Sequence, residues 1–214
     1  MRAAYLVTAC VLSLAASAAQ AQVIVLGDST AAACYQAAEF GTMGLRDGFD
    51  VCTQALNVPG LSLRDRAGTY VNRAVIRMRA GDYQGALTDS ESGIKLVGSL
   101  GEAHVNRGAA LLNLSRAPEG LIAINTGLAN GSGRLHLVYY NRAAAKELTG
   151  DVRGAYYDYR MAVELRPDFA LANEQLQRFQ VVRRAASNTT EREQAKDGMY
   201  EDVVALRGMP GRTQ

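Results

Sequence analysis

Apolar and small residues recur at helical spacing along much of the chain, and one such stretch occurs twice. Residues 70–87 read YVNRAVIRMRAGDYQGAL, and residues 139–156 read YYNRAAAKELTGDVRGAY. In both copies a Gly-Asp pair separates two segments whose spacing is typical of amphipathic helices. We therefore expect each copy to fold as two helices joined by a short turn.

The duplicated stretch belongs to a longer repeat, which an Asn-Arg pair marks three times. Asn72, Asn106 and Asn141 are 34 and 35 residues apart. Small residues follow each pair at matching distances: Ala74, Ala86 and Gly93, then Gly108, Gly120 and Gly127, then Ala143, Ala155 and Ala162. A period of about 34 residues indicates a repeat of two helices. Small side chains where the helices cross let the two backbones approach closely.

This pattern resembles that of the tetratricopeptide repeat family. The resemblance implies repeats over residues 67–100, 101–135 and 136–169, and the last of these matches most fully. One such hairpin cannot bury its apolar face alone, so the repeats are expected to stack. The expected fold class is therefore all-α, an α-solenoid of helix-turn-helix repeats.

The middle repeat is the weaker match. Ser115-Arg116 stands where the other copies have Gly-Asp, and Pro118 follows early in the second helix. Proline is tolerated in the first turn of a helix, because its missing N–H has no helical partner there. The helix pair is therefore expected to persist in this copy.

Residues 29–66 carry the same pattern in a looser form. STAAACYQAAEF and LRDGFDVCTQAL are typical of two helices, with Asp28 or Ser29 as the cap of the first. Ser62 and Asp65 form a capping sequence that predicts an early start for the next helix. We interpret this region as a degenerate first helical hairpin.

The chain after the last repeat divides into two parts. Residues 170–186 have helical spacing with a polar outer face, which is typical of the helix that covers the end of a repeat array. Residues 187–214 carry mixed charge and are expected to form a mobile tail, with a helical stretch around 191–207.

The first 21 residues have the features of a signal peptide. One Arg precedes an apolar run, and Ala19-Gln20-Ala21 matches the small-x-small site of signal peptidase. An uncleaved membrane anchor would need about 20 apolar residues, more than this run supplies. Lipid attachment at Cys10 would require cleavage before this residue, which would leave the signal almost no apolar segment. Cleavage after Ala21 predicts a periplasmic protein, with secretion as the alternative.

Export leaves two cysteines, Cys34 and Cys52, in an oxidising compartment. They lie eighteen residues apart and lack the CxxC spacing of redox or zinc sites. One interpretation is a disulfide that joins the first two helices and contributes about 3 kcal/mol. The alternative is two separate buried thiols.

Neither composition nor motifs indicate catalysis. The net charge of +2 gives no indication of a nucleic acid or an anionic membrane as partner. No nucleophile, metal or phosphate-binding motif is found. His104 occupies the packing position of Tyr70 and Tyr139, and His136 is expected to be solvated. We expect a protein that is not an enzyme, with no cofactor and no metal.

Arg73, Arg107 and Arg142 recur with the asparagines and could bind an anionic ligand. Asp89 and Asp158 follow the first and last of these arginines by sixteen residues, which favours internal ion pairs. The middle repeat has Ala123 instead, so Arg107 would need the carboxylate of Asp89.

The resemblance also implies that the first helices of the repeats line a concave groove for a peptide or helix. The positions it predicts are Val71, Asn72, Val75, Met78, Arg79, Glu102, Val105, Asn106, Ala109, Leu112, Asn113, Leu137, Tyr140, Asn141, Ala144, Glu147 and Leu148. An Asn side chain offers both a donor and an acceptor, which suits an extended peptide backbone. The alternative is that the three asparagines only tie helices together.

Two function classes follow from this pattern. The first is a periplasmic scaffold or adaptor that binds another protein through the groove. The second is a structural or assembly component that uses its convex face, where Tyr156, Tyr157 and Tyr159 gather. The partner and the oligomeric state are left open.

Overall fold

The computed structural model describes residues 29–183 and 202–206, and within them the chain is a row of helical hairpins. The helices are α1 Ser29–Phe40, α2 Leu45–Leu56, α3 Leu63–Arg79, α4 Tyr83–Leu96, α5 Gly101–Asn113, α6 Ala117–Ala129, α7 Leu135–Leu148, α8 Val152–Leu165 and α9 Ala170–Leu176. Two strands follow, β1 Phe179–Arg183 and β2 Asp202–Leu206. The predicted leader, residues 1–21, lies outside the described residues.

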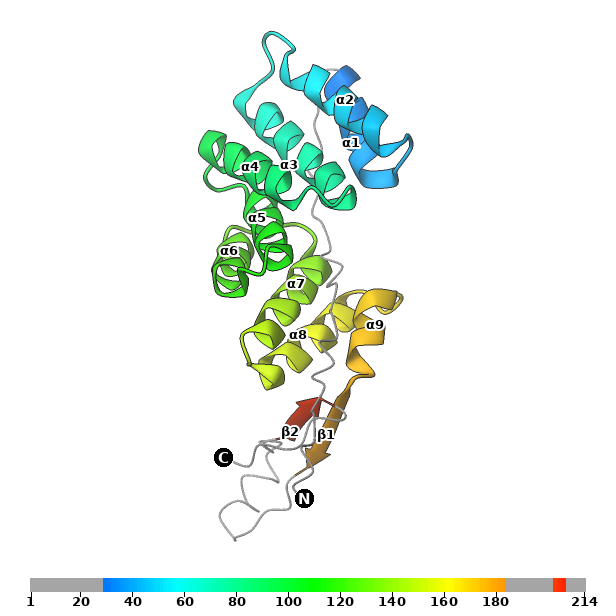
Figure 1. The fold of residues 1–214 in the computed structure, drawn as a ribbon, viewed down its shortest axis with the longest axis vertical. Coiled ribbons are helices and arrows are strands. Elements are labelled where there is room, and N and C mark those ends of the chain that lie inside the picture. Colours follow the sequence, from blue (N-terminus) through cyan, green and yellow to red (C-terminus); the bar gives the residue numbers. More distant parts are fainter. Residues whose placement is uncertain (1–28, 184–201, 207–214) are drawn as a thin grey trace, which may run out of the picture.

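The hairpins α1–α2, α3–α4, α5–α6 and α7–α8 stack in chain order along the long axis of the molecule (Figure 1). The first helices, α1, α3, α5 and α7, pack against one another, and we call them the inner row. The second helices pack between successive members of this row. This arrangement confirms the predicted all-α solenoid. None of the described helices is long and apolar enough to cross a membrane.

Glycine and aspartate form the turns of the second and fourth hairpins. Gly81 and Gly150 have φ angles of 78° and 91°, in a region that side chains with a Cβ rarely adopt. Asp82 and Asp151 then accept a hydrogen bond from the backbone N–H three residues later, at 2.8 Å in both cases. These side chains satisfy a donor that the helix itself leaves unpaired. The repeated Gly-Asp pair is therefore a turn followed by a helix cap.

The third hairpin makes the same turn without those residues. Ser115 has φ 61°, the only positive value among the described residues other than glycine. Arg116 precedes α6 without forming a side-chain cap and instead pairs with the exposed Glu119. Pro118 lies in the first turn of α6, as predicted. The predicted early start of α3 is also confirmed, because the Ser62 hydroxyl accepts from the backbone N–H of its first turn.

Backbone contact at the crossing of α5 and α6 explains the glycines of the third repeat. A Cβ on Gly127 would lie 2.8 Å from the carbonyl oxygen of Gly101, and one on Gly108 would lie 2.9 Å from that of Gly120. Both distances are too short for a real side chain. In the neighbouring hairpins buried alanines such as Ala74 and Ala143 stand at the position of Gly108.

The two cysteines form a disulfide between α1 and α2. Both side chains are fully buried in the core that the first hairpin shares with Val75 and Ile76 of α3. The bond therefore links the two helices of the degenerate hairpin, which has a neighbour in the described chain on one side only.

The C-terminal region differs from the predicted capping helix over 170–186. The helix α9 ends at Leu176, and β1 begins at Phe179 and pairs antiparallel with β2. The expected helical stretch around 191–207 is also wrong where it is described, because residues 202–206 are β2. Both segments contain paired valines, and β-branched residues favour a strand once a partner strand is present. The remaining tail residues lie outside the described part.

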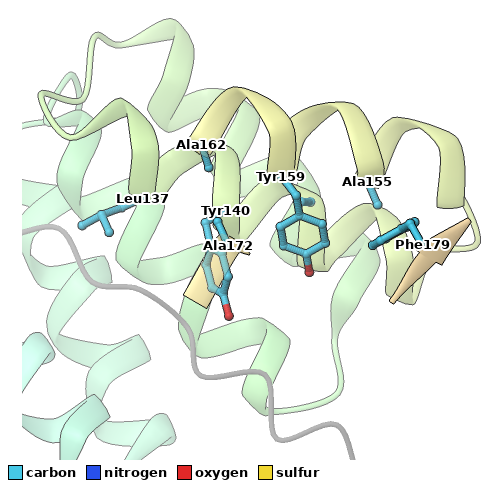
Figure 2. Close-up of a cluster of buried hydrophobic side chains, with 8 residues drawn as sticks. Leu137, Tyr140, Ala155, Tyr159, Ala162, Ala172 and Phe179 are labelled. Atoms are coloured by element: carbon cyan, nitrogen blue, oxygen red, sulfur yellow. The ribbon is translucent and has the colours of Figure 1, made fainter. Parts of the chain in front are cut away.

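A core cluster joins the end of the array to this ribbon. It contains Leu137, Tyr140, Ala143, Ala155, Tyr159, Ala162, Ala172 and Phe179, from α7, α8, α9 and β1 (Figure 2). The Tyr156 and Tyr159 rings both lie within 6 Å of the Phe179 ring, centroid to centroid. The short helix and the ribbon together therefore cover the last hairpin, which is the role that the sequence assigned to one longer helix.

Replacing Gly127 with Ala is expected to lower the free energy of unfolding by about 1–3 kcal/mol, because a Cβ there meets backbone that cannot move independently. Chemical denaturation would measure the loss. Gly98→Ala is the matched control, since its Cβ would have one neighbour at 3.8 Å. Equal stability of the two variants would contradict the close crossing.

Replacing Ser115 with Gly is expected to raise the melting temperature. Glycine relieves a left-handed conformation that costs other residues roughly 1–2 kcal/mol, and part of this gain is offset by its greater chain entropy. Gly150→Ser makes the reverse change at the equivalent turn and should lower the melting temperature. Scanning calorimetry of both variants would test this, and shifts of the same sign would refute it.

Candidate protein-interaction site

The three repeated asparagines lie on α3, α5 and α7, one on each helix of the inner row. Asn72, Asn106 and Asn141 are each 0% exposed, and all three have interaction partners. The Nδ2 of Asn106 donates to the backbone oxygen of Val71 at 3.5 Å, which links α5 to α3. At this position the amide ties neighbouring inner helices, as the alternative interpretation of the sequence proposed.

The apolar positions predicted for the groove are mostly part of the core. Each is buried and packs in a cluster with residues of neighbouring helices: Val71, Val75, Met78, Val105, Ala109, Leu112, Leu137 and Ala144. Val75, for example, packs against the first hairpin. These side chains therefore hold the hairpins together.

The chain itself covers two further predicted groove residues on α7. The ring of Tyr140 lies 5.6 Å from that of Tyr159, centroid to centroid (Figure 2). It lies 5.3 Å from the ring of Phe169. The carboxylate of Glu147 pairs with Arg178, and the hydroxyl of Tyr159 donates to it. Burial raises the pKa of Tyr159, and the charge of Glu147 raises it further, so this hydroxyl stays protonated as a donor.

Four of the predicted positions keep exposed or half-exposed side chains. Arg79 ends α3, and Leu148 ends α7 with 50% of its surface exposed. Glu102 and Asn113 lie at the two ends of α5, where Glu102 accepts from the backbone N–H of Gly133. The accessible ones among the predicted positions are thus at the helix ends.

The repeated arginines of the second and fourth hairpins form internal ion pairs, as predicted. Arg73 donates through Nε and Nη2 to the two oxygens of Asp89, at 2.9 and 2.7 Å. Arg142 binds Asp158 in the same way, at 2.7 Å for both contacts. The hydrogen bond to Asp158 holds the pKa of Arg142 above its usual value against the opposing effect of burial.

Each of these aspartates also holds a second cation, which the sequence interpretation missed. Arg77 lies 3.2 Å from Asp89, and Lys146 lies 2.9 Å from Asp158. Both cations stand four residues after the repeated arginine, so they share its helix face. That offset was a signal in the sequence that could have identified them.

The third hairpin replaces this charged group with apolar residues. Leu111 stands at the position of the second cation and Ala123 at that of the aspartate, and both are buried. Arg107 turns instead to Glu91 of α4, at 3.3 Å. The expectation that it would use Asp89 is wrong, because Arg73 and Arg77 already occupy that carboxylate.

The two histidines have packing roles. His104 is half-buried, and its Nε2 lies 2.8 Å from the backbone oxygen of Gly98. His136 is also half-buried, edge-on to Phe169 at 5.3 Å, so it is solvated only in part. Burial and then the charge of Arg166 lower its pKa. Within the described ranges no group of three or more His, Cys, Asp or Glu residues could hold a metal ion.

Comparison with known proteins identifies the fold. No family model and no curated protein matches the sequence. The structure is similar to MamA (41-end) from Desulfovibrio magneticus RS-1, with TM-score 0.54 and 16% identity over 70% of this chain and 82% of that one. It is also similar to the TPR domain of Arabidopsis OM64, with TM-score 0.51 and 20% identity over 55% and 96%. The chain therefore has the tetratricopeptide repeat fold.

Replacing Asp158 with Asn is expected to lower the free energy of unfolding by about 3 kcal/mol, because two partly buried cations lose their counter-charge. Glu91→Gln is the control. Its carboxylate is 52% exposed against 7% for Asp158, so its loss should stay below about 1 kcal/mol. Urea denaturation of both variants would measure the difference, and similar losses would contradict the structural role of Asp158.

Proposed function

We propose that this protein is a non-enzymatic scaffold that binds a peptide or helix of another protein along the inner row. The observation that carries the proposal is the row itself, in which α3, α5 and α7 lie next to one another and are held in place by buried side chains. A face that is already ordered loses little conformational entropy on binding. A regular row of helices also suits an extended or helical partner.

The contacts proposed for the partner differ from those that the sequence favoured. The asparagines and most apolar positions hold the helices in place, so the accessible side chains at the helix ends make the contacts. These are Arg79, Glu102, Asn113 and Leu148, which combine both charges, an amide and an apolar group. The partner is therefore expected to be amphipathic.

The proposed location is the periplasm, reached through cleavage of the leader after Ala21. The disulfide between Cys34 and Cys52 supports an oxidising compartment, because such bonds are rare where thiols are kept reduced. The leader supplies the export signal in this proposal.

A second candidate function is assembly through the outer helices. Tyr157, Met161 and Leu165 are exposed at successive turns of α8. Ile122 is 66% exposed on α6, at the position equivalent to Tyr157. An apolar row of this kind is common at protein interfaces.

One pair of substitutions separates the two candidates. Peptides selected from a displayed library against the wild-type protein would be titrated against Leu148→Ser on the inner row and Ile122→Ser on the outer face. The proposal predicts about tenfold weaker binding for the first, which corresponds to about 1.4 kcal/mol, and no change for the second. Circular dichroism would confirm that both variants are folded.

The opposite pattern would reject the inner row as the binding face. Peptide binding lost only in Ile122→Ser, together with a particle size that grows with concentration in light scattering, would favour assembly through the outer face.

A further inference from the structure

A charged cluster links two helices that are not neighbours in the stack. Glu39 lies in the last turn of α1, and Arg134 immediately precedes α7. Their side chains form an ion pair across 95 residues of sequence. In the described chain α1 packs against α2 and α3, whereas α7 packs against α5, α6 and α8. The ion pair therefore spans the inner row instead of joining packed neighbours.

Arg79, the last residue of α3, belongs to the same cluster. Its Nη1 donates to the backbone oxygen of Ala37, at 3.4 Å. Burial lowers the pKa of Arg79, the charge of Glu39 opposes this, and the charge of Arg134 adds to the lowering. The ends of α1 and α3 and the start of α7 thus share one electrostatic environment.

Neither partner of the ion pair suits its own helix. A carboxylate is disfavoured at the C-terminal end of a helix and a cation at the N-terminal end, because each meets a partial charge of its own sign. Glu39 and Arg134 have these unfavourable positions, so their stabilisation comes from each other. Local helix stability does not explain either residue.

The pair is also incompletely satisfied. One oxygen of Glu39 accepts from Arg134, whereas Oε2 is buried and has no hydrogen-bond partner among the described residues. The side chains are 13% and 33% exposed, so opening the pair would return a buried carboxylate oxygen to water. Leaving such an atom unpaired is unfavourable, which partly offsets the attraction within the pair.

We propose that Glu39, Arg79 and Arg134 form a clasp that holds the first hairpin toward the start of α7 and so sets the curvature of the inner row. Closed, the clasp fixes the spacing between the two ends of the row. Open, it lets the first hairpin move away from α7 while each hairpin stays folded. The clasp is a property of the free protein and does not depend on the proposed binding function.

Distance measurement between spin labels tests the clasp directly. The labels would be attached at Gln36→Cys on α1 and Asn130→Cys before α7, both exposed positions, in the full chain carrying Cys10→Ser. Glu39→Gln, Arg134→Gln and the double variant are each expected to shift the distance distribution to longer values by the same amount. Equal shifts are expected because either change opens the whole pair.

Arg160→Gln is the control, because it breaks an exposed ion pair with Glu164 within α8 and should leave the distribution unchanged. Circular dichroism would show that the hairpins stay folded. Salt supplies a second test, because the screening length falls from about 10 Å at 0.1 M to about 3 Å at 1 M. High salt should lengthen the distances in the wild type and leave Glu39→Gln unchanged. Wild-type distances in all clasp variants, or shifts that add in the double variant, would overturn the proposal.

Discussion

Contact between two backbones at the crossing of α5 and α6 is the constraint on which the centre of the array depends. Glycines on both helices bring each backbone against the other, at a separation that leaves no room for a Cβ. Val105 and Leu112 of α5 pack beside this crossing and share one core cluster with residues of α6 and of α7 in the next hairpin. Each hairpin thus exposes an apolar face that only the next hairpin can bury.

The array stabilises its hairpins in two different ways. The second and fourth hairpins bury an aspartate between two cations, whereas the third uses Leu111, Ala123 and the glycine crossing. A buried charge group needs all of its members, because losing one leaves the others uncompensated. The stability of a close apolar crossing depends instead on the volume of the side chains that fill it. Most side chains at the predicted groove positions are buried in this stack. The side chains at the helix ends are therefore the main ones that a partner could contact.

Features that depend on nearby residues could be predicted from the sequence. The period, the Gly-Asp turns, the cap at Ser62 and the two bidentate arginine pairs all arise within one hairpin or its repeat. Features that depend on distant parts of the chain could not be predicted in this way. Tyr140 and Glu147 are covered by residues that follow the fourth hairpin, and β1 requires the pairing of β2.

The same limit applies to the groove interpretation, which stays a prediction. The positions carried over from the family pattern do lie on the first helices. The pattern does not say which of these side chains become buried between stacked hairpins. The burial of Val75 depends on the first hairpin, which departs most from the repeat. The pair between Glu39 and Arg134 joins residues that lie 95 positions apart, so no local pattern encodes it.

The central claim is that the hairpins are stabilised by their neighbours, and native-state hydrogen exchange measured by mass spectrometry tests it most directly. Helices with neighbours on both sides should open least often. The account predicts the slowest exchange in α4, α5 and α6, with protection falling toward α9 and the ribbon. Central helices that exchange faster than both ends, or hairpins that exchange independently of position, would contradict it.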